Sequence, residues 1–275
     1  MFNRKSPIEL KKPAEFERMR IAGLVVADTL KLLREAVKPG MTTGDLDTIA
    51  RDAIAQAGAT PSFLGYHGYP AVICTSVNEE IVHGIPGDRV IHEGDVVSID
   101  CGAIVDGWHG DAAFSMVVGE GSDEVRRLLE VTETALWRGI AKAVPGGRLS
   151  DIGHAVEAHV RAAGEFGVVE EYVGHGIGTS MHMDPSVPNY GQPGHGPKLL
   201  AGMALAIEPM VNLGSRHTKT LDDEWTVVTL DGSRSAHFEH TVAITAAGPW
   251  VLTAHDGGAS RLAALGVPTP ATATT

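Results

Sequence analysis

Apolar positions recur with two different periods along the chain, and these periods predict helices separated by strands. Residues 14–36 and 123–143 show the spacing of amphipathic helices. Short apolar runs at 96–99 and 112–114 instead flank Asp106-Gly107, a dipeptide typical of a hairpin turn. The pattern therefore predicts a β-hairpin between two helical regions.

The predicted hairpin carries two aspartates among apolar neighbours. If the chain turns near residues 105–107 with a loop of even length, Asp100 and Asp111 lie on one face as direct or diagonal neighbours, roughly 5–8 Å apart at Cβ. Two buried carboxylates this close repel each other. One interpretation is a solvated hairpin with two surface aspartates. The apolar flanks favour the other, in which a cation lies between the two and further ligands come from elsewhere in the chain.

The chain also contains an internal repeat. PGMTTGDLDTIARDAIAQAG (39–58) and PGGRLSDIGHAVEAHVRAAG (145–164) both open with Pro-Gly and close with Ala-Gly, as expected for a loop, an N-cap and an amphipathic helix. EGDVVSID, ending at Asp100, and AGMALAIE, ending at Glu208, extend the match to an apolar strand followed by a carboxylate. Chance similarity between two helices is the alternative, and the strand match argues against it. We therefore expect an α+β domain of two similar halves around a curved, largely antiparallel sheet.

Composition narrows the class of protein. The 275 residues are 43% hydrophobic, enough for one large domain or two small ones. The net charge of −12 argues against nonspecific binding to nucleic acid, and no DNA partner is expected. The basic start lacks an apolar signal segment, and no apolar run reaches membrane-spanning length. Two cysteines, Cys74 and Cys101, are too few for a disulfide scaffold. A cytoplasmic protein that does not bind membranes is expected.

Three further residues can complete a cation site around the hairpin aspartates. Glu208 precedes Pro209, which favours extended backbone and hence a position at a strand end. Alternation in SAHFEHTVAI places Glu239 on the same face as His237. His175 lies between glycines in YVGHGIG, which leave the ring accessible. Taken singly, each glutamate is more often an exposed strand residue, and a lone loop histidine is more often not a ligand.

The complete set is more specific than its members. Two aspartates, two glutamates and one histidine exceed what one divalent ion needs, whereas two ions about 3.5–4 Å apart, bridged by carboxylates and a water, need such a set. An oxygen-rich shell favours harder ions such as Mn²⁺ or Fe²⁺ over a structural zinc. Two such ions would produce a hydroxide nucleophile at neutral pH. The hairpin aspartates are therefore predicted to hold part of a dinuclear metal centre.

Five motifs carry a resemblance to a known family. NEEIVHGIP, GDVVSIDCGAIVDGWHGDAAFSM, GHGIGTSMH, GMALAIEPMV and HFEHTVAI occur in the order and spacing of the type I methionine aminopeptidases, and the resemblance runs from about residue 15 to 255. It implies the pita-bread fold, with two pseudo-symmetric α/β halves around a curved antiparallel sheet. We accordingly expect an N-terminal arm at 1–13, a single catalytic domain at 14–255 and a C-terminal tail at 256–275. We expect this tail to be disordered, because its end, residues 268–275, is small and polar and contains two prolines.

The resemblance also implies roles for individual residues. The implied metal ligands are Asp100, Asp111, His175, Glu208 and Glu239. The implied catalytic residues are His83, His182 and Glu208, of which both histidines would also contact the substrate. The implied lining of a methionine pocket is Tyr66, Tyr69, Cys74, Met181 and Trp225. Met181 stands where bacterial members usually have phenylalanine, and Ala112 and Ala206 stand where threonines are common. These departures bear on the pocket shape and on hydrogen bonds around the ligands.

The implied reaction is the removal of N-terminal methionine from nascent proteins with a small second residue. It would use two divalent ions (Mn²⁺, Fe²⁺ or Co²⁺) and a bridging hydroxide, with Glu208 as proton acceptor, His182 assisting the oxyanion and His83 steadying the scissile amide. One alternative is a Xaa-Pro aminopeptidase, which would need a large N-terminal domain. The other is a metal-free binding module of the same fold, in which ligands would be lost.

The expected partners are nascent polypeptides. Contact with the ribosome is a further hypothesis, based on the basic stretch GSRHTKT (214–220), for which a solvated surface loop is the alternative. The enzyme is expected to be a monomer.

Overall fold

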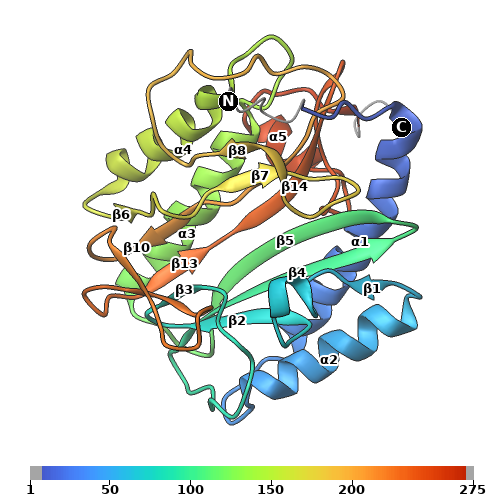
Figure 1. Cartoon of the computed structure of the whole chain (residues 1–275). Coiled ribbons are helices and arrows are strands. Elements are labelled where there is room, and N and C mark those ends of the chain that lie inside the picture. The colour runs from blue at the N-terminus through green and yellow to red at the C-terminus, as the bar shows by residue number, and fades with distance from the viewer. Residues whose placement is uncertain (1–7, 271–275) are drawn as a thin grey trace, which may run out of the picture.

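The computed structural model describes residues 8–270, and a curved antiparallel sheet forms its centre (Figure 1). Its strands are β1 (Thr60–Pro61), β2 (Ile73–Val77), β4 (Val96–Val105), β5 (Trp108–Val117), β7 (Gly174–Gly176), β8 (Met183–Val187), β9 (Ala204–Ile207), β14 (Glu239–Thr245) and β15 (Gly248–Val251). They follow the order β1–β4–β5–β14–β9–β7–β8, with β2 beside β4 and β15 beside β14. The predicted α+β class with an antiparallel sheet is confirmed.

Two three-stranded sheets extend this framework toward the left in Figure 1. One contains β6 (Gly167–Val168), β10 (Met210–Asn212) and β13 (Ser235–His237), and the other contains β3 (Glu80–Val82), β11 (Thr218–Thr220) and β12 (Val227–Thr229). A single-turn 3₁₀ helix, η1 (Tyr66–Gly68), lies between β1 and β2. Of the predicted pocket residues, Tyr66 lies on η1, and Trp225 lies in the connection between β11 and β12.

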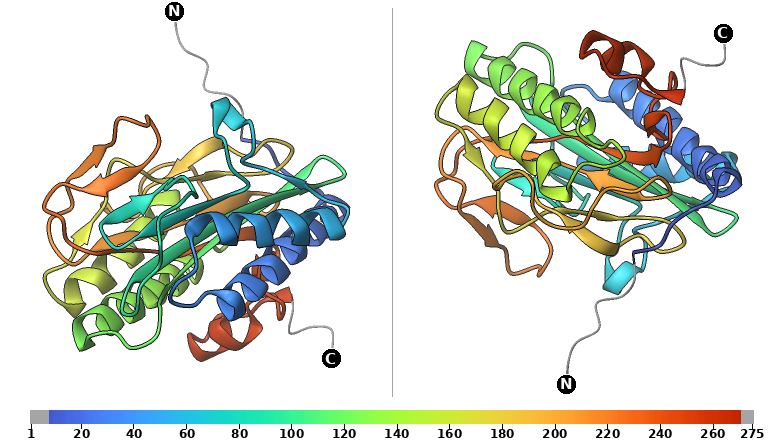
Figure 2. Two further views of the ribbon diagram at one scale, coloured as in Figure 1. Left: turned by 90° about the horizontal axis from the view of Figure 1, so that it is seen from below. Right: turned by 90° about the horizontal axis from the view of Figure 1, so that it is seen from above.

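The helices pack on one face of the central sheet (Figure 2). They are α1 (Pro13–Ala36), α2 (Thr43–Gln56), α3 (Asp123–Ile140) and α4 (Leu149–Ala163). Helix α1 crosses β5 so closely that a Cβ on Gly110 would lie 2.8 Å from the Cα of Gly23, so position 110 needs glycine. Position 23 needs glycine as well, because a Cβ there would overlap the Leu252 carbonyl oxygen. Cys101 and Ala112 belong to the core under the helices. Because side chains alternate along a strand, Asp100 and Asp111 face the opposite side of the sheet.

The internal repeat corresponds to α2 and α4, and the same contact begins each helix. Asp45 accepts a hydrogen bond from the Thr42 N–H at 2.8 Å, and Asp151 accepts one from the Arg148 N–H at 2.7 Å. A carboxylate at this position satisfies a free N–H of the first turn and favours helix initiation. The two copies thus start their second helices in the same way, as expected for pseudo-symmetric halves.

The C-terminal segment differs from the predicted disordered tail in residues 256–270. Helix α5 (Ala259–Ala264) follows Asp256, whose carboxylate accepts hydrogen bonds from the N–H groups of Gly258 and Ser260 at 2.9 Å each. Leu262 is fully buried against the main core, and Arg261 pairs with Glu133 at 3.4 Å. A helix cap and one apolar anchor therefore order a segment whose small, polar composition suggested disorder. Residues 271–275 lie outside the described residues, as do residues 1–7 of the predicted N-terminal arm.

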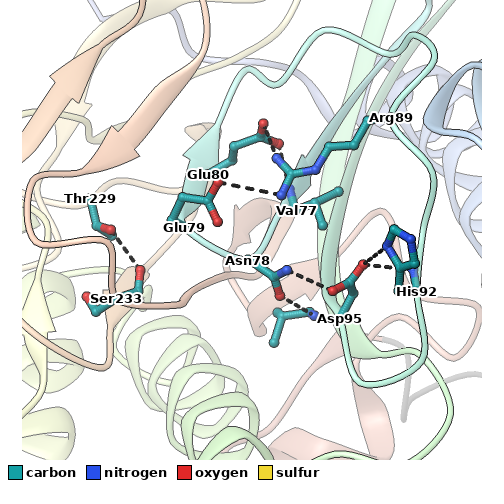
Figure 3. A network of polar contacts seen from close by, with 10 residues as sticks. Val77, Asn78, Glu79, Glu80, Arg89, His92, Asp95, Thr229 and Ser233 are labelled. Atoms are coloured by element: carbon teal, nitrogen blue, oxygen red, sulfur yellow. Dashed lines mark hydrogen bonds and ion pairs between the residues drawn. The ribbon is translucent and has the colours of Figure 1, made fainter.

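A polar network holds the loop that follows β3 (Figure 3). Arg89 pairs with both Glu79 and Glu80 next to β3, and Asn78 donates to Asp95 at 2.8 Å. The loop is thus tied down on both sides, which fixes the position of its first residue, His83. No helix within residues 8–270 has both the length and the hydropathy needed to cross a membrane.

Candidate active site

The register of three neighbouring strands brings three predicted ligands to one face. Ala113 of β5 pairs with Asp100 of β4 on one side and with Glu239 of β14 on the other, so both acids point the same way as Ala113. Asp111 pairs with Gly102 and is the diagonal neighbour of Asp100. The predicted hairpin geometry is therefore confirmed, and β14 adds its glutamate to the same surface.

His175 and Glu208 approach these acids from the other half of the chain. Glu208 follows the last residue of β9, and its carbonyl accepts a hydrogen bond from Asn189 at 3.1 Å. The Nε2 of His175 lies 3.5 Å from Glu208 Oε1 and 4.0 Å from Asp111 Oδ2. The Nδ1 of His175 lies 3.0 Å from the Gly176 carbonyl, which can only accept. Nδ1 therefore carries the proton, and the Nε2 lone pair faces the carboxylates, as a metal-binding imidazole requires.

The four carboxylates lie together without cationic side chains to neutralise them. Burial raises the pKa of Asp100 to about 7 and that of Glu208 to about 8, and burial with mutual repulsion raises the pKa values of Asp111 and Glu239 well above their usual range. Asp100 Oδ1, Asp111 Oδ1 and Glu239 Oε1 are buried without hydrogen-bond partners. In residues 8–270 no lysine or arginine pairs with any of the four. Oxygen donors that are buried, unpaired and mutually repelling fit divalent cations.

Two predicted histidines stand beside these ligands. His182 is exposed, its ring centre lies 4.2 Å from that of His175, and its Nδ1 lies 2.8 Å from the Tyr66 hydroxyl. His83 has a positive φ of 61°, a strained conformation for a residue other than glycine. Burial lowers the pKa of His83 to about 4, with nearby His237 and His182 adding to the shift, so its imidazole is neutral near pH 7.

A cavity of about 430 Å³ opens onto the carboxylates. It is lined by all the predicted site residues, namely Asp100, Asp111, His175, Glu208, Glu239, His83, His182, Tyr66, Tyr69, Cys74, Met181 and Trp225. Tyr69, Cys74 and Met181 form a small apolar cluster with Phe63, against which Trp225 packs. The Tyr69 and Trp225 rings meet edge to face, with centres 5.0 Å apart. One end of the cavity is therefore apolar and the other strongly acidic.

The prediction of the site missed three residues around the cavity. Phe63 and His67 line it, and neither belongs to the five motifs. His237 lies behind the ligands, with Nε2 3.7 Å from Glu208 Oε2, and its donor atom lies within 4.8 Å of those of Glu208 and Glu239. The alternation of SAHFEHTVAI placed His237 on the face of Glu239, so the sequence did contain the signal for this residue.

The two alanine departures lie in different surroundings. Ala112 belongs to the core on the helix side of the sheet, away from the carboxylates. Ala206 pairs with His175 across β9 and β7 and offers no hydrogen bond from its side chain. A hydroxyl that does contact one of the predicted ligands belongs to Thr241, which donates to the Asp111 carbonyl at 2.8 Å and accepts from the Asp111 N–H at 3.0 Å. Thr241 thus fixes the backbone of Asp111.

The geometry agrees with what comparisons with known proteins find. Residues 17–246 match the model of metallopeptidase family M24. The chain is 56% identical to methionine aminopeptidase 1 of Mycobacterium tuberculosis over 245 residues, which are 87% of this chain and 92% of that protein. It superposes on the crystal structure of methionine aminopeptidase from Thermotoga maritima with a TM-score of 0.88 at 45% identity, covering 90% of this chain and 99% of the other.

A more distant likeness concerns the fold alone. Prolidase from Pyrococcus furiosus superposes with a TM-score of 0.70 at 22% identity, and the match covers 89% of this chain and 65% of that one. The pita-bread architecture therefore also occurs in a protein that is named a prolidase and not a methionine aminopeptidase. The extent and identity of the other matches show that the chain is a metallopeptidase of family M24 and belongs, within it, to the methionine aminopeptidases.

Proposed function

We propose that this chain hydrolyses the first peptide bond of polypeptides that begin with methionine, with two divalent ions held by Asp100, Asp111, His175, Glu208 and Glu239. The observation that carries the proposal is the cavity with one acidic and one apolar end. The acidic end has unpaired buried carboxylate oxygens, and the apolar end is lined by Phe63, Tyr69, Cys74 and Met181. The number of ions and their identity as Mn²⁺, Fe²⁺ or Co²⁺ are part of the proposal.

The residues around the cavity divide the chemistry among them. When bound, divalent ions supply Lewis acidity and lower the pKa of water. With the ions bound, the Glu208 carboxylate can accept a proton from a neighbouring water. If the Tyr66 hydroxyl donates to Nδ1 of His182, the proton of that imidazole lies on Nε2, where it can stabilise the developing oxyanion. His83, neutral and fixed by its loop, is placed to contact the scissile amide.

The apolar end accounts for the choice of methionine. Cys74 and Met181 offer polarisable sulfur atoms, and Tyr69 and Trp225 offer aromatic faces and edges, which suit a thioether. The free amine and the carbonyl of the substrate must both lie at the acidic end. The side chain of the second residue is then close to the wall of the site, which is why we propose that small second residues are preferred.

Nascent polypeptides in the cytoplasm are the proposed substrates, and the ribosome is a proposed partner. Arg216 of the basic stretch pairs with Glu170, so part of its charge is already compensated within the chain. His217 and Lys219 are exposed, so these two side chains remain available to contact the ribosome. Replacing Arg216 and Lys219 by glutamate is expected to weaken salt-sensitive ribosome co-sedimentation and to leave peptide hydrolysis unchanged.

The test combines metal content with peptide specificity. Protein freed of metal with a chelator is titrated with Mn²⁺, Fe²⁺ or Co²⁺ under anaerobic conditions, and bound metal is counted by elemental analysis. Release of methionine is then measured for Met-Ala-Ser and Met-Phe-Ser, with Ala-Pro-Ser as the control for Xaa-Pro activity. We expect two ions per chain and cleavage of Met-Ala-Ser alone. Fast cleavage of Ala-Pro-Ser, or methionine release by metal-free protein, would refute the proposal.

A further inference from the structure

The Glu208 carboxylate lies between two imidazoles, one facing each of its oxygens. His175 Nε2 lies 3.5 Å from Oε1, and His237 Nε2 lies 3.7 Å from Oε2. His175 has a role in the proposed centre, whereas His237 has none. The His237 side chain is 2% exposed, and its Nε2 is buried without a hydrogen-bond partner. An unpaired buried donor aimed at a carboxylate requires an explanation, because such a group costs stability.

The backbone around His237 holds the imidazole where it is. Ser115 of β5 accepts a hydrogen bond from the His237 N–H and donates one to the His237 carbonyl, each at 2.8 Å. His237 also pairs with Met210 across β13 and β10, two residues after Glu208 in sequence. This pairing fixes β13, which carries His237, relative to β10, which begins two residues after Glu208. The pairing of β13 with β10 therefore places the His237 imidazole beside the Glu208 carboxylate.

We propose that His237 is a positioning residue for Glu208, an inference that rests on the proposed metal centre. Its Nε2–H donates to Oε2 of Glu208 and leaves Oε1, the oxygen beside His175, free to bind a divalent ion. A carboxylate that binds metal through one oxygen keeps its orientation best when the other oxygen accepts a hydrogen bond. The present 3.7 Å separation requires only a small rotation of either side chain to reach hydrogen-bond length.

The alternative role for His237 is direct ligation. Its Nε2 and the carboxylate oxygens of Glu208 and Glu239 lie within 4.8 Å of one another, which is compatible with a shared ion. Glutamine at position 237 distinguishes the two roles, because it can replace a hydrogen-bond donor but not a metal-binding imidazole. The amide N–H₂ of glutamine can donate to Oε2 but is a poor metal ligand, so His237→Gln preserves positioning and abolishes ligation.

The experiment measures metal affinity rather than turnover. Full-length wild-type, His237→Ala and His237→Gln proteins are titrated with Mn²⁺ by calorimetry, and their Co²⁺ forms are compared by visible absorption. We expect His237→Ala to weaken the affinity for Mn²⁺ roughly 10- to 100-fold and His237→Gln to recover most of it, since loss of a group that orients a ligand has this effect. Both variants should retain the band positions of Co²⁺, because the coordinating atoms are unchanged.

His240→Gln is the matched control. His240 lies three residues away on the opposite side of the sheet, where its ring contacts Trp137. Its affinity for Mn²⁺ should equal that of the wild type, and thermal unfolding of the metal-free proteins verifies that each variant is folded.

The outcomes distinguish a failure of the His237 positioning role from a failure of the proposed metal centre. Unchanged Mn²⁺ affinity in His237→Ala overturns the positioning role, as does an equal loss in the His240→Gln control. A His237→Gln protein as weak as His237→Ala, with shifted Co²⁺ bands, shows ligation and also overturns it. If the wild type binds no divalent ion, the proposed metal centre itself fails.

Discussion

The acidic end and the apolar end of the cavity are built from different parts of the fold. The acidic floor, which consists of Asp100, Asp111, Glu208 and Glu239, lies on or directly after strands of the central sheet. Most of the apolar end lies on η1 and on loops between strands, namely Tyr66, Met181 and Trp225, which we call the apolar wall. Cys74 of the same end lies on β2 and pairs with Asp100. Pairing fixes the floor from both sides, whereas the wall depends on packing among a few side chains. The carboxylates are thus held by the rigid central sheet. The residues that select the side chain of the substrate lie on segments that can vary without moving a predicted ligand.

The largest expected effect comes from removing one charge of the floor. Asp111→Asn or Glu239→Gln should abolish peptide hydrolysis, because the remaining carboxylates no longer hold the metal centre. The metal-free variants should nevertheless unfold at a higher temperature than the metal-free wild type, because one of the mutually repelling buried acids has been neutralised. Activity assays with excess metal and thermal unfolding test both parts. Near wild-type turnover in either variant would remove that residue from the centre.

A smaller loss of activity is expected from changes at His182 and at its partner in the apolar wall, Tyr66. His182→Ala should lower kcat by roughly 10²- to 10³-fold, as for a lost oxyanion donor, with little effect on metal content. Tyr66→Phe should have a milder effect of the same kind, since it removes only the hydrogen bond to His182. Steady-state kinetics and elemental analysis provide the measurements. Should His182→Ala keep its kcat, the imidazole takes no part in the reaction.

The wall should affect substrate binding more than turnover. Met181→Ala enlarges the pocket and removes a polarisable contact, and we expect KM for a Met-Ala peptide to rise about 10-fold, the effect of one to two kcal/mol of apolar contact. Metal affinity should be unchanged, because Met181 is not a ligand. Calorimetry with Mn²⁺ serves as the internal control. A metal affinity that fell with KM would show that wall and floor are not independent.

The mildest test changes only the pH. Burial raises the pKa of Asp100 to about 7 and that of Glu208 to about 8 in the folded, metal-free protein, far above an unfolded value near 4. Protons are therefore held more tightly by the folded state, and the stability from these groups is full below about pH 4 and lost as the pH rises through 7–8. Thermal unfolding after chelation should give a lower Tm at pH 8.5 than at pH 5.5 by at least a few degrees. Added Mn²⁺ should reduce this difference, and a metal-free Tm that rises with pH would contradict the assignment.

The sequence predicted the floor better than its surroundings. The hairpin register of Asp100 and Asp111 follows from the turn at Asp106-Gly107 and from strict alternation, both of which are local. The pairing of β14 with β5, which brings Glu239 beside them, is a long-range event that no local pattern encodes, and only the five motifs indicated it. Phe63 lies in an irregular segment after β1 and His67 lies in η1, and neither residue carried a signal in the sequence. The order of residues 256–270 was missed because a single buried leucine and one aspartate cap outweigh the average composition.

The position of β14 between β5 and β9 has a consequence for the order of assembly. Asp111 contacts Thr241, a residue 130 positions later, so the strand that completes the centre is synthesised long after the hairpin. Before β14 pairs with β5, the hairpin of β4 and β5 has an unpaired edge. Its two aspartates also have no cation beside them, so the site cannot form from the N-terminal half alone. Metal binding is consequently linked to the joining of the two halves. A nascent copy of this chain can complete the site only after β14, which ends at Thr245, has been synthesised.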